Sequence, residues 1–220
     1  MDEKNFIRLE NVNKTLKGRE VLKDISLTLE RGGVYAFFGR NASGKTMLFR
    51  AIAGLILPDS GTVTVFGQRI SEQRIFPNNM GLIIESIGLW PQMTGFENLA
   101  LIAGIKNVAG EEEIRRALTR VGLDPEDKRK YRAYSMGMKQ KLALAQAIME
   151  EPELLILDEP TNGLDEEAVE LFREIVVQEK KRGATCLIAT HQLDDIKDLY
   201  DEIYHVKDGR CRWETGEVEA

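Results

Sequence analysis

The segment Gly39-Arg40-Asn41-Ala42-Ser43-Gly44-Lys45-Thr46 combines glycines, a lysine and a hydroxyl at fixed spacing between a short apolar run, 34–38, and a helical pattern. The glycines permit a tight loop whose backbone N–H groups converge on a phosphate, and the following helix start adds a favourable dipole. We expect Lys45 to neutralise β- and γ-phosphates and the Thr46 hydroxyl to ligate Mg²⁺. A surface glycine loop with a chance lysine is the simpler alternative, but the flanking strand and helix argue against it.

A second polar feature is a pair of carboxylates, Asp158 and Glu159, directly after the apolar run 154–157. Such a run is typical of a strand buried on both faces, and the carboxyl ends of parallel strands are where α/β sheets bind ligands. Asp158 is predicted to be a partner of Mg²⁺, and Glu159 the base that orients and polarises an attacking water. A strand that merely ends in charged residues is the alternative. Together the two motifs predict an enzyme that binds a nucleoside triphosphate such as ATP.

The elements that must position these residues follow from hydrophobic patterning. Two strands separated by Lys17-Gly18 are predicted to form an antiparallel start, and strands alternating with helices predict an α/β fold with a mostly parallel, covered sheet. The expected strands are 6–12, 21–29, 34–38, 62–66, 154–157 and 185–189, and the expected helices outside the loop are 111–121, 139–150 and 166–181. We predict a single domain, 1–220, in which 1–86 and 140–220 form the core and an antiparallel β subdomain and 87–139 form an inserted helical subdomain.

Composition narrows the class of protein. The chain has 220 residues, of which 43% are hydrophobic and 30% charged, as in soluble globular enzymes. The net charge of −6 is spread along the sequence, so we expect no nucleic acid partner. No apolar run approaches the roughly 20 residues that span a bilayer, and none resembles a signal peptide. The isolated cysteines, Cys186 and Cys211, are predicted to be reduced structural thiols, which suits the cytoplasm.

Three further segments narrow the choice among nucleotide-hydrolysing enzymes. Tyr134–Gln140 resembles a variant of the signature sequence of the ABC family, Pro160–Asp165 resembles the family's D-loop, and His191 resembles its switch histidine. The motifs occur in the family's order over essentially the whole chain. The resemblance implies the fold of a P-loop NTPase. Because His191 follows a predicted strand at the ligand-binding edge, we expect it to contact the γ-phosphate and hold the water with Glu159; His205 is expected to be structural.

The resemblance implies a mechanism that needs two copies. Ser135 and Gly137 of one subunit would donate to the γ-phosphate held by Lys45 of the other, and Asp165 would join the same nucleotide site. A homodimer around two ATP molecules is therefore expected. The family also implies an integral membrane subunit as partner, and a cytoplasmic location, peripheral on the inner face of the cell membrane.

Three departures from the family pattern bear on these expectations. Leu16 stands where an aromatic residue often stacks on adenine, so base selectivity is expected to be loose. Glu85 stands where a glutamine usually contacts Mg²⁺ and the membrane subunit; a carboxylate can still ligate the ion. Met136 and Met138 replace residues of the signature. Such signatures resemble those of bacterial drug, antibiotic-peptide and ion exporters, so export is the expected direction.

Two other functions stay open at this stage. One is a non-transport ABC ATPase that acts on a macromolecular complex, although the long coiled-coil insertions, metal hooks or tandem cassettes of such proteins are missing from the sequence. The other is a small-molecule phosphotransferase. The apolar residues near 85–101, which include Ile87, Leu89, Trp90 and Phe96, either receive a helix of a membrane subunit or pack the subdomain core.

Overall fold

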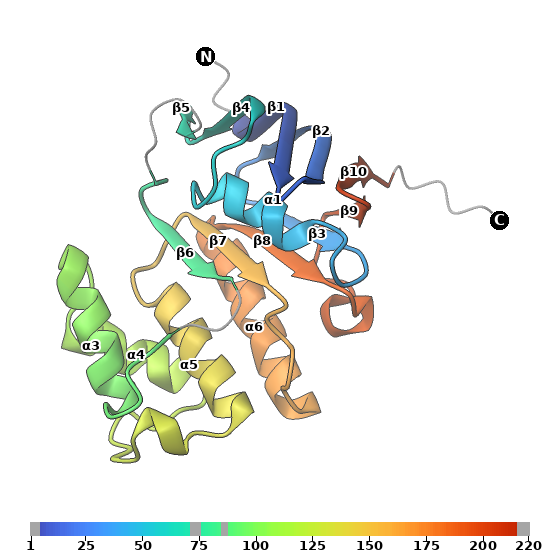
Figure 1. Ribbon diagram of the computed structural model, residues 1–220. Coiled ribbons are helices and arrows are strands. Elements are labelled where there is room, and N and C mark those ends of the chain that lie inside the picture. Colours follow the sequence, from blue (N-terminus) through green and yellow to red (C-terminus); the bar gives the residue numbers. More distant parts are fainter. Residues whose placement is uncertain (1–4, 71–75, 85–87, 215–220) are drawn as a thin grey trace.

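The computed structural model describes residues 5–70, 76–84 and 88–214, and its elements form two sheets with helices around them (Figure 1). The larger sheet has the order β10-β9-β3-β8-β7-β6. Its neighbours from β9 to β6 are parallel, while β10 pairs with β9 antiparallel. Its strands are β3 (Val34–Phe38), β6 (Met80–Ile83), β7 (Leu154–Asp158), β8 (Thr185–Thr190), β9 (Glu202–Lys207) and β10 (Arg210–Trp213).

The smaller sheet is antiparallel and has the order β2-β1-β4-β5. A tight turn at Lys17 and Gly18, both with positive φ, joins its two long strands. The register places Leu9 opposite Leu27 on one side and Val63 on the other, so alternate apolar residues share one buried face. Its strands are β1 (Asn5–Leu16), β2 (Arg19–Glu30), β4 (Ser60–Val65) and β5 (Gln68–Arg69).

Several helices begin at residues whose side chains accept hydrogen bonds from the first N–H groups. Thr94 and Glu97 form a capping box at the start of α3, and Asp165 accepts from the N–H of Ala168 at the start of α6. Gly183, in a left-handed conformation, ends α6. The helices are α1 (Lys45–Ile52), α3 (Gly95–Lys106), α4 (Glu111–Arg120), α5 (Met136–Ile148) and α6 (Glu166–Arg182), with short 3₁₀ turns η1 (Tyr131–Ala133) and η2 (Leu193–Ile196).

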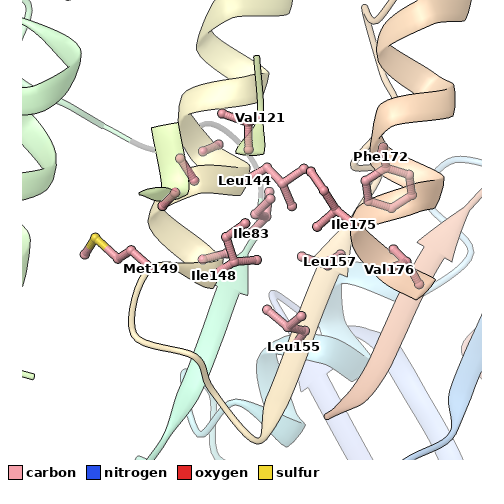
Figure 2. Packing of buried hydrophobic residues seen from close by; sticks show 14 of the residues in the cluster. Ile83, Val121, Leu144, Ile148, Met149, Leu155, Leu157, Phe172, Ile175 and Val176 are labelled. Atoms are coloured by element: carbon pink, nitrogen blue, oxygen red, sulfur yellow. The ribbon is translucent and has the colours of Figure 1, made fainter. Parts of the chain in front are cut away.

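The larger sheet is buried on both faces, which produces two hydrophobic cores. On β7, Leu155 and Leu157 point into the core that α5 and α6 cover, where they meet residues such as Ile148 and Ile175 (Figure 2). Leu154 and Ile156 point the other way, into the core formed with α1 and the antiparallel sheet. All five residues of β7 are buried. The strand that ends in Asp158 is therefore fixed from above and below.

The predicted fold class is confirmed: a mostly parallel sheet, an antiparallel sheet and helices are all present. The predicted strands and helices all occur, with ends shifted by a few residues, but the predicted start of one helix at Lys139 is wrong. The helix α5 begins at Met136 because Ser135 accepts a hydrogen bond from the N–H of Met138 and so caps it. Strands β5, β6, β9 and β10 were not predicted. The division at 87–139 stays a prediction.

None of the helices within the described ranges has the length and apolar character needed to span a bilayer.

Candidate functional site

The glycine-containing loop lies between the end of β3 and the start of α1, as its sequence predicts. A side chain at Gly39 is impossible without a shift of the backbone, because a Cβ there would lie 2.2 Å from the carbonyl oxygen of Val206. Gly44 has φ of 116°, which glycine adopts readily, and it forms the N-cap of α1. The N–H of Ser43 donates to the carbonyl of Arg40 at 3.1 Å. These constraints turn the loop around the helix start, where free N–H groups attract an anion.

The loop borders a cavity of about 1110 Å³ at the carboxyl edge of the larger sheet. Its wall also comes from the turn of the antiparallel sheet, from β2 and from the end of the β9–β10 hairpin. Leu16, 37% exposed, is among the lining residues, and its contact with a base stays a prediction. The lining residues include Leu16, Gly18, Val21, Asn41, Ala42, Ser43, Gly44, Lys45, Thr46, Glu159, Asp208 and Gly209.

Lys45 brings a positive charge into this cavity. Its side chain is only 5% exposed, and Nζ donates to the carbonyl of Gly39 at 2.5 Å and to that of Arg40 at 3.3 Å. Nζ also lies 3.2 Å from Oε1 of Glu159. A cation held this way is ready to exchange its carboxylate partner for phosphate oxygens. Sequence patterning gave no indication of the Lys45–Glu159 ion pair, since the two residues are far apart in the chain.

Thr46 and Asp158 meet beside the lysine. The Thr46 hydroxyl donates to Oδ2 of Asp158 at 2.6 Å. Within the described part of the chain, no group of three His, Cys, Asp or Glu side chains is arranged to hold a metal. A hydroxyl and one carboxylate nevertheless fit Mg²⁺, which keeps several waters and takes phosphate oxygens. Ser43 Oγ is buried and has no hydrogen-bond partner among the described residues, so the loop holds a further polar atom suited to a bound nucleotide.

Glu159 and His191 are in direct contact at the same edge. Nδ1 of His191 lies 2.8 Å from Oε2 of Glu159, and their side chains are 33% and 20% exposed. The backbone of Glu159 is left-handed, with φ of 50°, and its N–H donates to the carbonyl of Ala189 at 2.9 Å. The predicted base is therefore in contact with the predicted phosphate-contacting histidine, and its carboxylate lies between His191 and Lys45. His205 contacts Glu214 and Phe38 instead, away from this cavity.

The β9–β10 hairpin supports the phosphate loop. The N–H of Gly209, in the turn of the β9–β10 hairpin, donates to the carbonyl of Ser43 at 2.8 Å, and its own carbonyl accepts from the N–H of Lys23. This contact was missed by the sequence analysis. The signal was present, since Asp208-Gly209 between alternating apolar residues is typical of a hairpin turn.

Ser135, Gly137 and Asp165 lie on a different surface. With Met136 and Gly163 they line an open hollow of about 600 Å³, and no described residue lines both this hollow and the loop cavity. Ser135 and Asp165 are exposed and serve as N-caps of α5 and α6. Met136 is 72% exposed, and a Cβ on Gly163 would come within 2.6 Å of its sulfur, so the two segments touch.

Glu85, the remaining predicted metal ligand, lies outside the described residues, as does Ile87.

Comparison with known proteins gives a family match and several similar sequences. A family model described as ABC transporter matches residues 22–162. An uncharacterised ABC transporter ATP-binding protein of Bacillus subtilis, YybJ, is 44% identical over 96% of each chain. The bacitracin transport ATP-binding protein BcrA of Enterococcus faecalis is 37% identical over 92% of this chain and 67% of its own. The lantibiotic transport ATP-binding protein SrtF of Streptococcus pyogenes is 33% identical over 93% of this chain and 88% of its own.

Solved structures show the same fold. An ATP-binding subunit of an ABC transporter superposes with a TM-score of 0.85 at 28% identity, covering 96% of this chain and 90% of that one. A dimeric ATP-binding cassette in a post-hydrolysis state, bound to ADP and Pi, superposes with a TM-score of 0.86 at 23% identity, covering 95% of this chain and 98% of that one.

Proposed function

The chain belongs to the ABC transporter family, and from this premise we propose that it is the ATP-hydrolysing subunit of a transporter that works as a dimer closing around two ATP molecules. The observation that carries the proposal is the gathering of five side chains at one sheet edge, beside a cavity large enough for a nucleotide. Three of them line the cavity, Lys45, Thr46 and Glu159, and the other two, Asp158 and His191, contact these.

Each of these residues takes a role that its position favours. The loop N–H groups and Lys45 bind the β- and γ-phosphates, and Lys45 then leaves Glu159 for the more highly charged triphosphate. Glu159, still held by His191, orients the attacking water and accepts its proton. Thr46 and Asp158 are the residues that would hold Mg²⁺, which neutralises charge on the phosphates when bound. Arg40, Asn41 and Ala42 complete the phosphate loop.

The second copy supplies the side of the site that one copy leaves open. Ser135 and Gly137 belong to a surface that shares no described lining residue with the chain's own cavity, which supports a role on a nucleotide held by another copy. The exposed start of α5 offers N–H groups and a hydroxyl to a γ-phosphate. A symmetric pair of copies satisfies both sites at once, with Asp165 at the same interface.

We further propose export through a separate integral membrane subunit, with this chain on the cytoplasmic face of the cell membrane. Relatives named for bacitracin transport and lantibiotic transport support a transport role of this kind. The signature with Met136 and Met138 supports the direction. Stable co-purification with a polytopic membrane protein is the expected result. A chain found only with a soluble macromolecular complex would favour the alternative, a non-transport ABC ATPase.

Glu159→Gln tests the enzymatic part. The amide cannot accept the proton of the attacking water, so ATP hydrolysis should fall roughly hundredfold to thousandfold. ATP binding should persist, and light scattering should show a dimer in ATP and a monomer without it. Glu112→Gln, on the exposed surface of α4, is the matched control and should hydrolyse normally. A Glu159→Gln variant with normal turnover would remove this residue from the role of base.

A further inference from the structure

The segments that carry Glu159 and His191 are joined by another hydrogen bond, outside the cavity. The Thr161 hydroxyl donates to Oδ2 of Asp195 at 2.6 Å. Thr161 follows Glu159 by two positions, and Asp195 follows His191 by four. Neither belongs to the described cavity lining. Asp158 and His191 also lie outside it, but they contact the lining residues Thr46 and Glu159, whereas Thr161 and Asp195 contact each other.

Both partners of this bond are held in place by their surroundings. Thr161 is only 5% exposed, and a short bond from a hydroxyl to a carboxylate is among the stronger hydrogen bonds in proteins. The carbonyl of Asp195 accepts from Nη1 of Arg173 on α6 at 3.3 Å. The next residue, Ile196, is fully buried in the core beneath α5 and α6. Asp195 is thus a fixed anchor for Thr161.

Three contacts connect the segment that carries Glu159 with the segment that carries His191. The N–H of Glu159 donates to the carbonyl of Ala189, its carboxylate contacts His191, and Thr161 donates to Asp195. The first contact fixes the backbone N–H of Glu159, and the second fixes its carboxylate; neither fixes the loop that follows this residue. Because Glu159 has a left-handed backbone that a side chain disfavours, its conformation must be imposed by the residues around it.

We infer that Thr161 and Asp195 form a positioning pair for hydrolysis, which fixes the loop after Glu159 relative to His191. The inference rests on the proposed function. With the bond intact, the carboxylate stays where it can reach both His191 and the water. Without it, the loop relaxes toward a common backbone conformation, and the base moves away from the reacting water while the phosphate loop is unchanged.

Thr161→Val tests this pairing, because valine matches the shape of threonine and lacks only the hydroxyl. The kcat for ATP hydrolysis should fall about tenfold, as small displacements of a reacting group cause, while the KM for ATP changes less than about twofold. Thr161→Ser restores the donor and should recover most of kcat. Asp195→Ala should match Thr161→Val, and the double variant should be no slower than either, since both remove one interaction.

Thr119→Val is the matched control. Its hydroxyl donates to the carbonyl of Arg115 on the exposed surface of α4, and kcat should stay at the wild-type value. Thermal unfolding of every variant checks the fold; if Thr161→Val does not fold, Asp195→Ala, at the more exposed partner, carries the test.

Several results would overturn the inference. They are a kcat within twofold of wild type for Thr161→Val or Asp195→Ala, a change in KM in place of kcat, losses that multiply in the double variant, or no recovery with serine. If these occur while Glu159→Gln is inactive and the wild type is active, only the positioning pair fails. A wild-type chain without ATPase activity would overturn the proposed function and this inference with it.

Discussion

The phosphate loop and the signature surface differ in how far the fold completes them. Around Lys45, side chains are buried or half-buried and contact one another within the same copy, and Gly39 has no room for another atom. Around Ser135 the surface is open, and Met136 is 72% exposed. There the polar side chains of Ser135 and Asp165 only cap their own helices.

This difference shows which part of the site is built by folding and which is built by association. A buried cluster of charges needs the whole core around it, because an uncompensated buried charge is costly. The exposed start of α5 carries no buried charge, and Ser135 caps it within the same copy. Its conformation therefore does not depend on the second copy. The two regions can therefore be disabled separately, which gives the following tests.

The largest effect is expected from mixing two inactive variants. Lys45→Ala removes the phosphate cation, and Ser135→Asp keeps the N-cap of α5 while placing a negative charge where the partner's γ-phosphate would lie. Each alone should lose ATP hydrolysis at least about hundredfold. Mixed in equal amounts, they should regain roughly a quarter of wild-type activity, because half of the dimers are mixed and each has one intact site.

A mixture as inactive as its components would contradict a site shared between copies. Lys128→Met, at a highly exposed lysine, serves as the control for removing a positive charge and should hydrolyse ATP normally.

The second test compares two glycines. Gly39→Ala should destabilise the fold by about 1–3 kcal/mol, because the new methyl group meets the Val206 carbonyl at 2.2 Å. At Gly137 the nearest atom to a new methyl group is 3.5 Å away and the residue is helical, so Gly137→Ala should leave the free energy of unfolding unchanged within about 1 kcal/mol. Urea denaturation measures both. Equal losses would show that the signature surface is as constrained as the loop.

The smallest effect concerns the hairpin that supports the loop. Burial raises the pKa of the Cys211 thiol on β10 from 9.0 to about 12. Its folded pKa lies above the unfolded one, so its contribution to stability is complete below pH 9 and is lost as pH rises toward 12. The melting temperature should fall between pH 9 and 10.5, less steeply in Cys211→Ala. Rapid alkylation of native Cys211 at pH 8 would show instead that the hairpin is open.

Much of this arrangement could be predicted from sequence because its signals are local. The apolar run 154–157, the loop after 34–38 and the carboxylates at 158 and 159 each combine composition with an immediate structural context. The strand β6 has only four residues, including Met80 and Gly81, and lacks any clear pattern. Strand β9 contains Ile203, Tyr204 and Val206 just before Asp208-Gly209, so its omission was a missed hairpin signal.

The contacts between distant segments could not be read from the chain. Lys45 with Glu159 and Thr161 with Asp195 depend on which strands are neighbours and on side-chain direction. The predicted start of α5, at residue 139, was three residues too late because Ser135 was not recognised as the N-cap of the helix. The role of Glu85 rests on sequence alone.

The position of β3 between β8 and β9 has a consequence for biosynthesis. The phosphate loop is synthesised well before both strands that flank β3, and well before the Gly209 turn that bonds to Ser43. A nascent chain therefore carries the loop sequence long before it has a nucleotide site. The loop gains its neighbours in the sheet and its bond to Gly209 only after β8 and the β9–β10 hairpin have been added, so the loop sequence alone does not make the site.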